Sequence, residues 1–569
     1  MEKITGFSIN RALTKPTFAW LIYFFFFILL FLQFPISKSL PGKVDTWFHL
    51  AIFNGYENEL KEWILGEWNG TPYYPEKTMI QFGEPTPGNG VIFLFFRFLG
   101  FSNLHAYFLF TAFLFSLNGM GMFLLVRSMG GKPEFSFVSG FFFSASCFAF
   151  GQLDHPNTGS WAFALFSLTA LNDFIGTEQN SFAVKSTLFA VIQIYFSGYI
   201  FIYLIPLLFL FGILAWKKLK VNLIAQKKLL LLFPLFIIFI SPYLYAYVAN
   251  PILSNSYNPA IEFRGAEISN LKPFDLLRSL PGNILYGDQN YEEYPLLNSI
   301  RSANVGIFIW VLALAGIARI NKTRFLFLGI FSIGLILAIG PYMDFGKLRF
   351  PFILYPAYEW GLAQFLRTPV RAFSVILIFL SASSALFLQD IFENKNIKPL
   401  FLIIPILLFS IENIPMPFRK YDSWKFIEPN PDYISVLKNK GKVLVELPSG
   451  IFLGKKQFTG SLDEINREHI YAFWQTFHKL NIPNGSSGFF PSSRLKTNSQ
   501  MINLSKDDNL RKLIFENEVD FIAWHKNMLL DFETEENYSF LKSQLFLEII
   551  LNNNELTVFK VRKELFSVE

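Results

Sequence analysis

The chain has 569 residues, of which 52% are hydrophobic and only 16% are charged. Soluble domains carry about a quarter charged residues, and here the apolar residues fall in long blocks, so the composition excludes an ordinary soluble protein and indicates a polytopic membrane protein. The net charge of +6 does not indicate nucleic-acid binding, because the basic residues lie in short loops between apolar segments, and the single cysteine, Cys147, excludes an internal disulfide and a cysteine-rich zinc site.

The apolar segments predict about eleven transmembrane helices. They cover residues 17–36, 104–126, 135–153 and 161–175, two short spans within 186–216 that separate at Ser197-Gly-Tyr199, and then 229–247, 305–318, 325–339, 372–388 and 399–410. Basic residues precede the first span, which places the N-terminus in the cytoplasm, and an odd number of spans leaves the C-terminus outside. Residues 83–90, rich in proline and glycine, are expected to be non-helical, and the apolar piece 91–99 is too short to span.

The first outer loop, residues 37–90, opens with the stretch Lys43-Val-Asp-Thr-Trp-Phe-His49. If this stretch is helical, Asp45 and His49 lie one turn apart on the same face. A carboxylate and an imidazole at a membrane–water boundary can accept a proton, hold a metal or orient a hydroxyl group. The alternative is a solvated loop in which Asp45 caps a helix.

The next outer loop carries a second such pair, Asp154 and His155, followed by Pro156. The two loops lie on the same membrane face, so these acidic positions could converge over a cavity; the alternative is a polar turn between helices. Gln193 is a polar residue within a span, where it either packs helices together or lines a cavity.

Two further outer loops are predicted at residues 249–303 and 340–371. The second ends with Phe365-Leu-Arg-Thr-Pro-Val-Arg371, which places Arg367 and Arg371 at the outer boundary. Two guanidinium groups are suited to a phosphate or pyrophosphate. The alternative is that they extend toward lipid headgroups, as arginines at span ends commonly do.

The composition changes near residue 413, where charged residues become frequent and apolar runs shorten. Residues 442–447, 519–524 and 556–561 are predicted strands, and residues 463–479 and 508–516 are predicted helices. We therefore expect a membrane domain at 1–412 and a small α/β domain at 413–569, outside the membrane.

Several stretches resemble known families. The first outer loop resembles that of the GT-C glycosyltransferases, polytopic enzymes that use polyprenyl-phosphate-linked sugars. The chain is also similar to the YfhO-like group of bacterial membrane proteins. That second resemblance rests on Trp68-Asn-Gly-Thr-Pro-Tyr, Gln152-Leu-Asp-His-Pro-Asn, Ile339-Gly-Pro with the arginine stretch, Val443-Leu-Val-Glu-Leu-Pro, and Tyr471-Ala-Phe-Trp-Gln-Thr-Phe-His478 through Asn484-Gly. For His478 and Asn484 we expect a structural role.

The GT-C resemblance implies a role for each candidate residue. Asp45, with His49 beside it, would act as the general base or orient the acceptor hydroxyl, and Asp154 with His155 would position the acceptor. Asp45 and Asp154 are also the candidate ligands of a divalent cation, Mg or Mn. Members often have two acidic residues in the first-loop signature, whereas here the next acid after Asp45 is Glu57. Arg367 or Arg371 would stabilise the departing phosphate, and Gln193 and Tyr199 complete the predicted substrate-binding set.

The resemblance implies transfer of a sugar from a polyprenyl-phosphate-linked donor to a glycan, lipid or protein acceptor of the cell envelope. The reaction would take place at the outer face of the bacterial cytoplasmic membrane. Three alternatives remain: a transporter or flippase of lipid-linked glycans, a glycan polymerase or ligase, and an inactive scaffold. Transport is disfavoured because the ionisable residues lie in outer loops rather than near the middle of the spans.

Overall fold

The computed structural model divides into two compact units, which are described separately. The helical unit comprises Met1–Gly42, Thr86–Tyr243 and Pro259–Trp424, and the α/β unit comprises Lys43–Pro85, Leu244–Asn258 and Lys425–Glu569. The residues that the structure describes are 14–33, 39–41, 44–64, 72, 74–75, 84, 86–216, 231–245, 265–280, 283, 285–286, 302–321, 323–346, 348–361, 363, 366–394, 399–415, 423–425, 427–438, 440–449, 453–454, 457–458, 462–485, 492–506, 508–529 and 536–565.

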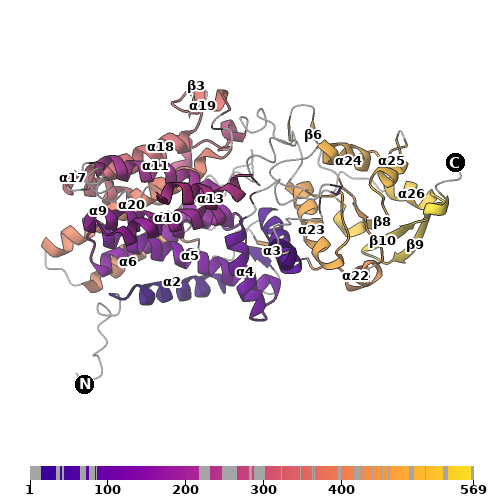
Figure 1. The fold of residues 1–569 in the computed structure, drawn as a ribbon, viewed down its shortest axis with the longest axis horizontal. Coiled ribbons are helices and arrows are strands. Elements are labelled where there is room, and N and C mark those ends of the chain that lie inside the picture. The colour runs from indigo at the N-terminus through magenta and orange to yellow at the C-terminus, as the bar shows by residue number, and fades with distance from the viewer. Residues whose placement is uncertain are drawn as a thin grey trace, which may run out of the picture. The chain divides into compact units, whose positions relative to one another are not determined.

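The helical unit is a bundle of mostly apolar helices (Figure 1). Its elements are α2 (Pro16–Phe31), α4 (Pro87–Phe98), α5 (Asn103–Ser128), α6 (Pro133–Ser144), α7 (Cys147–Phe150), α8 (Pro156–Gly159), α9 (Ala162–Thr177), α10 (Asn180–Phe196), α11 (Gly198–Leu214), α13 (Leu232–Leu244), η4 (Pro273–Leu277), α17 (Ile307–Arg319), α18 (Arg324–Ile339), α19 (Tyr355–Glu359), η5 (Pro369–Ala372), α20 (Phe373–Asn394), η6 (Pro399–Leu402) and α21 (Ile403–Asn413). Two small sheets accompany them: β2 (Tyr342–Phe345) pairs with β3 (Leu348–Pro351), and β1 (Ser39–Pro41) pairs with β4 (Ser423–Lys425).

Most predicted spans coincide with a helix, and the predicted break at Ser197 is confirmed, because α10 ends at Phe196 and the Ser197 side chain caps α11. Two predictions were wrong. The span expected at 135–153 is interrupted after Ser144, and a separate short helix, α7, starts where Ser146 Oγ accepts a hydrogen bond from the Ala149 amide. The stretch 83–90 is partly helical, since Pro87 occupies the first turn of α4, where its missing N–H has no cost.

Two stretches, Asn103–Ser128 and Pro369–Glu393, are both long and apolar enough to cross a membrane. Six shorter apolar helices of 10–17 residues accompany them in the part of the chain that is described, so the predicted number of eleven spans is not established. Several of these helices expose large apolar side chains one turn apart, such as Phe25 (58% exposed) and Leu29 (67%) on α2, and Ile307 (63%) and Val311 (59%) on α17. A helix that is apolar on its buried and exposed sides alike is typical of a membrane protein.

The α/β unit contains a four-stranded sheet in the order β5-β8-β10-β9. Its strands are β5 (Leu444–Leu447), β8 (Phe521–His525), β9 (Leu547–Asn552) and β10 (Leu556–Val561), with β5 parallel to β8 and the other neighbours antiparallel. The remaining elements are α3 (Val44–Ile64), β6 (Leu453–Gly454), β7 (Gln457–Phe458), α22 (Pro431–Leu437), α23 (Leu462–His478), α24 (Ser492–Ile502), α25 (Asn509–Glu516), η8 (Lys526–Met528), α26 (Glu536–Ser543) and η9 (Lys563–Leu565).

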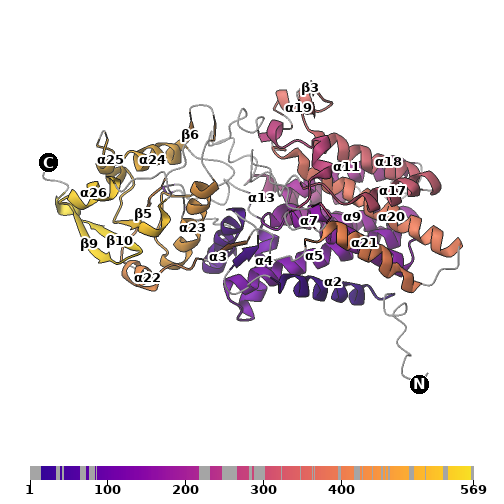
Figure 2. The same ribbon diagram turned by 180° about the vertical axis from the view of Figure 1, so that it is seen from behind.

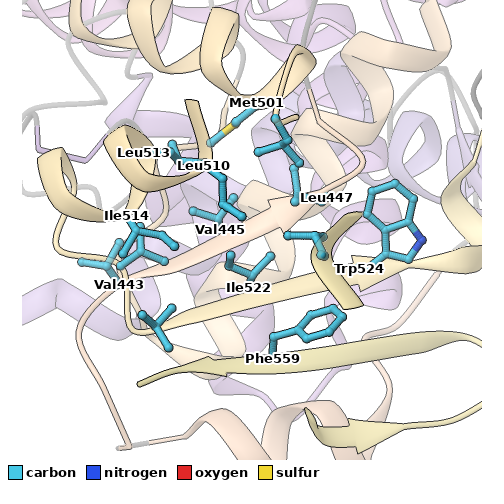
Figure 3. Close-up of a cluster of buried hydrophobic side chains, with 14 of the residues drawn as sticks. Val443, Val445, Leu447, Met501, Leu510, Leu513, Ile514, Ile522, Trp524 and Phe559 are labelled. Carbon is cyan, nitrogen blue, oxygen red and sulfur yellow. The ribbon is translucent and has the colours of Figure 1, made fainter. Parts of the chain in front are cut away.

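The two faces of this sheet differ in chemistry. Val443, Val445 and Leu447 lie on the face that packs against α24 and α25, in a core that also contains Ile522 and Trp524 (Figure 3). Because side chains alternate along a strand, Glu446 and His525 lie on the opposite face, with α22 and α23. The three strands predicted from the sequence are present, whereas β9 was missed.

Candidate functional site

Arg371 is the clearest candidate for binding an anion in the helical unit. It lies in η5 and is buried, with 6% of the residue exposed. The carbon of its guanidinium group lies 5.2 Å from the ring centroid of Tyr199, at the start of α11. Among the described residues no carboxylate forms an ion pair with Arg371, and its Nε has no hydrogen-bond partner. The structure therefore brings together two residues that the sequence assigned to substrate binding.

A buried guanidinium group without a counter-ion is unfavourable, because removing a charge from water costs several kcal/mol even after the protein relaxes. A cation–π contact contributes about 0.5–2 kcal/mol, which does not offset that cost. An anion at this position would supply the counter-charge that no described residue provides. A phosphate fits best, because two of its oxygens can each accept an N–H from the planar guanidinium group.

Arg367, the other predicted arginine, is partly exposed and precedes η5. Its carbonyl oxygen accepts a hydrogen bond from Ser269 Oγ at 2.8 Å, and the Val370 amide donates to the Ser269 carbonyl at 3.1 Å. The backbone of the arginine segment is thus held on both sides of Thr368 by one residue of a neighbouring loop. Of the two arginines, Arg371 is the one that the structure buries.

Asp154 and His155 form a buried pair between α7 and α8, with 3% and 4% of each residue exposed. Asp154 Oδ1 lies 2.8 Å from His155 Nδ1. An ionised carboxylate accepts the Nδ1 hydrogen, which leaves the lone pair of a neutral ring on Nε2, the arrangement of a general base. A side-chain hydrogen bond also stabilises this turn, because Thr158 Oγ1 donates to Gln152 Oε1 at 2.8 Å. The following helix, α8, packs against α11, which carries Tyr199.

Asn89, Ser160 and Gln193 join the ends of several helices near this pair. Ser160 Oγ donates to Asn89 Oδ1 at 3.0 Å, and Asn89 Nδ2 donates to the Phe196 carbonyl at 3.1 Å. Gln193 Nε2 donates to the Ser160 carbonyl at 2.9 Å, and its Oε1 accepts from the Ala164 amide at 2.8 Å. Both ends of this buried amide are used within the protein, so the geometry gives Gln193 a packing role in place of the predicted substrate contact. Asn89 was not noticed in the sequence, because it stands in a proline- and glycine-rich stretch typical of a turn.

Asp45 and His49 lie on α3, which confirms the helix that would place them on one face. Asp45 is in the first turn and half-buried, and His49 is 2% exposed, with Phe48 and Phe53 beside its ring at centroid distances of 5.7 and 5.9 Å. The helix belongs to the α/β unit, whereas the sequence had placed the whole first outer loop with the membrane domain 1–412.

Helix α3 is attached to the C-terminal part of the chain through α23. Three contacts define the interface: Trp47 with Phe473 and Phe48 with His469, each with ring centroids 5.2 Å apart, and Asn54 Nδ2 donating to Thr476 Oγ1 at 3.3 Å. The partners lie hundreds of residues apart in sequence, so no local pattern could have predicted this packing.

Glu446 stands at the centre of a buried polar cluster beneath α23. Its Oε2 lies 2.6 Å from His525 Nε2, its Oε1 accepts a hydrogen bond from the Tyr433 hydroxyl, and His478 Nε2 is 3.5 Å from the same oxygen. Burial alone would raise the pKa of Glu446, but the two histidines outweigh it and lower the pKa to about 2. The carboxylate is therefore ionised at neutral pH.

The other C-terminal stretches that the sequence singled out surround this cluster. The Asn484 side chain bonds both the amide and the carbonyl of Glu446, each at 2.9 Å. Beside it, Glu468 accepts from Arg494 Nη2 at 3.0 Å and from the Gly485 amide at 2.8 Å. These groups are buried and bonded to one another, which is the structural role expected for His478 and Asn484.

The described residues contain no group of three or more His, Cys, Asp or Glu side chains arranged to hold a metal ion. Asp154, one of the two carboxylates considered as ligands, has one oxygen bonded to His155, and Asp45 belongs to the other unit. A divalent cation held by Asp45 and Asp154 stays a prediction.

No family model and no curated protein matches the chain. Among solved structures it is similar to the arabinofuranosyltransferase AftD from Mycobacteria, with a TM-score of 0.58 and 13% identity over 95% of this chain and 40% of that one. A mutant form of AftD gives a TM-score of 0.54 and 12% identity over 95% and 41% of the two chains. The chain therefore shares the fold of AftD over most of its own length.

A third similar structure is the oligosaccharyltransferase AglB from Archaeoglobus fulgidus, determined with an inhibitory peptide and a dolichol-phosphate. It has a TM-score of 0.48 and 12% identity over 92% of this chain and 70% of AglB, a likeness too weak to establish a shared fold. None of these structures supports the resemblance to the YfhO-like group. The chain spans about two fifths of the length of AftD, and the likeness shows a shared fold rather than a particular activity.

Proposed function

We propose that this chain is a membrane glycosyltransferase whose sugar donor is linked to a lipid phosphate. The observation that carries the proposal is the buried guanidinium group of Arg371 over Tyr199, with no ion-pair partner among the described residues. A GT-C-type fold with apolar outward faces indicates a membrane-embedded protein. A buried cation in such a fold is suited to a phosphate that arrives on a lipid.

In the proposed reaction a hydroxyl oxygen of the acceptor attacks the anomeric carbon of the donor sugar. The bond from that carbon to the phosphate oxygen breaks, and the lipid phosphate leaves with the electron pair. Arg371 stabilises the charge that develops on the phosphate, and the hydroxyl proton passes to a base. Within the helical unit the candidate base is His155, oriented by Asp154; Asp45 is the base that the sequence predicts, and it is tested separately.

The finer features of the proposal come from the sequence. They are a polyprenyl phosphate as the lipid, a glycan, lipid or protein of the cell envelope as the acceptor, and the outer face of the bacterial cytoplasmic membrane as the location. A glycan polymerase or ligase is a second candidate, because Arg371 is equally suited to the pyrophosphate of a lipid-linked glycan. Such an enzyme would consume a preassembled lipid-linked glycan and ignore single-sugar donors.

The first experiment measures transfer of labelled sugar from polyprenyl-phosphate and polyprenyl-pyrophosphate donors by the purified chain in lipid nanodiscs. Arg371→Gln should lower the transfer rate about a hundredfold or more, the usual effect of removing a group that stabilises transition-state charge. Arg319→Gln is the matched control, because Arg319 is 54% exposed and pairs with Asp390 on the surface. A variant at Arg371 that transfers as fast as the parent would refute the phosphate assignment.

A second experiment tests Asp45. Asp45→Asn should abolish transfer while leaving the thermal unfolding curve unchanged, because an amide keeps the shape of the side chain but cannot take the proton. Asp432→Asn is the control, since Asp432 lies in the first turn of a helix of the same unit and is exposed. If Asp45→Asn is fully active and a variant at His155 is inactive, the base lies in the helical unit.

A further inference from the structure

The hairpin formed by β2 and β3 has two chemically different faces. The strands pair in the register Tyr342↔Pro351, Met343↔Phe350, Asp344↔Arg349 and Phe345↔Leu348. Directly opposed residues share a face and neighbours along a strand alternate. Asp344 and Arg349 therefore lie on a polar face with Tyr342, and the other face carries only the apolar side chains Met343, Phe345, Leu348 and Phe350.

The polar face is bonded to the rest of the helical unit. Arg349 donates two hydrogen bonds to Asp344, at 2.8 and 3.1 Å, and Asn270 Nδ2 donates to Asp344 Oδ2 at 3.1 Å and to the Tyr342 carbonyl at 2.8 Å. These charged hydrogen bonds set the orientation of the hairpin.

The apolar face is exposed. Phe345 is 51% exposed, Leu348 61% and Phe350 52%, and the segment that follows adds Ile353 at 64% and Trp360 at 73%. Soluble surfaces rarely gather so many large apolar side chains, and such patches mark interaction sites. Figures 1 and 2 show β3 and α19 projecting from the helix bundle near α18 and α11.

We propose that this apolar face inserts into one leaflet of the lipid bilayer. The occupant follows from the unit to which the hairpin belongs, because its apolar helices expose large apolar side chains on their outer sides, such as Phe25 and Leu29 on α2 and Ile307 and Val311 on α17. If these helices face lipid, a hairpin that begins at the end of α18 lies at the boundary of the same lipid. The composition fits the interfacial layer, where tryptophan, tyrosine and arginine gather, and the polar face keeps Asp344 and Arg349 away from hydrocarbon.

Insertion of the hairpin would also affect the position of Arg371, and this consequence alone rests on the proposed function. Asn270 holds the hairpin, and the adjacent Ser269 holds the carbonyl of Arg367 and the amide of Val370. Two consecutive residues thus connect the hairpin to the segment that carries Arg371. A hairpin seated at a defined depth in the leaflet sets the depth of the guanidinium group, and it does so at the level where a lipid phosphate lies.

The test places a spin label at Leu348→Cys in the chain reconstituted into phospholipid vesicles. Its collision rates with oxygen, which concentrates in hydrocarbon, and with a water-soluble nickel chelate are compared. The matched control is Leu545→Cys, at a residue 90% exposed in the α/β unit, and the parent, whose only cysteine is buried, is the blank. We expect label 348 to favour oxygen and label 545 to favour nickel. A label at 348 that favours nickel, or one shielded from both reagents by a second copy of the chain, overturns the proposal.

A kinetic arm separates the two proposals. Leu348→Ser with Phe350→Ser should raise the KM for a long-chain lipid donor severalfold and leave kcat and the KM for a short-chain, water-soluble donor unchanged. Leu545→Ser should change neither. If label 348 lies in lipid but the parent transfers no sugar, the hairpin proposal stands and the proposed glycosyltransferase activity is refuted. If the parent transfers sugar but label 348 is exposed to water, the activity stands and the hairpin proposal is refuted.

Discussion

Glu446 and Arg371 are both buried charged residues, and they differ in what surrounds them. The Glu446 carboxylate accepts hydrogen bonds from Tyr433 and His525 and has His478 nearby, whereas Arg371 has the ring of Tyr199 and no ion-pair partner among the residues described. A compensated charge holds a fold together at little net gain, while an uncompensated one has a free-energy deficit that a ligand can remove. Because of this contrast we propose a structural role for the α/β cluster and anion binding for Arg371.

Tyr199 allows the cation–π contact to be tested apart from the charge. Tyr199→Phe keeps the ring beneath the guanidinium group, so donor binding should change by less than a factor of about two. Tyr199→Leu removes the ring and should weaken donor binding by about fivefold, the equivalent of about 1 kcal/mol. Donor affinity measured by titration checks both values, and equal effects of Phe and Leu would show that the hydroxyl group matters rather than the ring.

Glu446 predicts how the stability of the α/β unit depends on pH. Its pKa is lowered to about 2 in the folded chain from an ordinary value of 4.5. A lowered pKa contributes stability that is fully present above pH 4.5 and is lost as the pH falls toward 2, a total on the order of 3 kcal/mol. Urea unfolding of the whole chain between pH 5 and 2.5 measures this loss of stability. Glu446→Gln should be less stable at pH 5 and should lack this part of the acid dependence; an unchanged dependence would contradict the assignment.

At the scale of elements, glycine determines how closely three helices of the bundle approach. A Cβ at Gly140 of α6 would collide with the Tyr23 hydroxyl of α2 and the Gly119 carbonyl of α5. Gly140→Ala should therefore destabilise the helical unit by about 1–3 kcal/mol. Gly176→Ala is the control, because nothing lies within 4 Å of a Cβ there and alanine favours a helix by up to about 1 kcal/mol. Thermal unfolding in one detergent compares the two variants. Equal shifts of their unfolding temperatures would refute the packing argument.

The interface between α3 and α23 makes a parallel prediction in the α/β unit. Phe473 is fully buried against Trp47, and Phe473→Ala should cost about 3–5 kcal/mol because it leaves a cavity. Phe515→Ala, at a side chain 78% exposed, should change stability by less than about 0.5 kcal/mol. Denaturant unfolding followed by tryptophan fluorescence measures both, and a small effect at Phe473 would mean that α3 is not held by this helix.

The elements themselves were largely predictable from local pattern. The alternation of side chains along residues 556–561 predicted β10, and the residue composition of 463–479 predicted α23. The pair Ser197-Gly198 predicted the break between α10 and α11. The failures also have physical causes. Strand β9 was missed because its run Leu-Glu-Ile-Ile-Leu does not alternate cleanly at a sheet edge, and the helical start at Pro87 was missed because proline usually marks a turn.

At the scale of the whole molecule, the sequence could not show which parts pack together. The bond between Asn54 and Thr476 joins residues 422 positions apart, and it places the Asp45 helix in the α/β unit. The same holds for Arg371 and Tyr199, whose residue types suggested phosphate binding but whose contact depends on the packing of distant helices. Residue type and predicted membrane position suggested a chemistry for each residue, whereas only the fold shows which of these residues contact one another.

Two units with separate cores should unfold in two steps. Scanning calorimetry of the chain in nanodiscs is expected to show two transitions, one lowered by Gly140→Ala and the other by Phe473→Ala. If each variant shifts both transitions equally, the two units unfold cooperatively, and the division of the chain into units does not correspond to separate unfolding steps.

The strand order of the α/β sheet has a consequence for the chain during synthesis. β10 is the last strand in sequence, yet it lies between β8 and β9 rather than at an edge. A chain cut before Leu556 would leave both neighbours with unpaired backbone groups and would remove the apolar side chains Val558 and Phe559 from the buried interior. The sheet can close only after β10 has left the ribosome, so a chain terminated before Leu556 exposes unpaired strand edges that can pair with other chains.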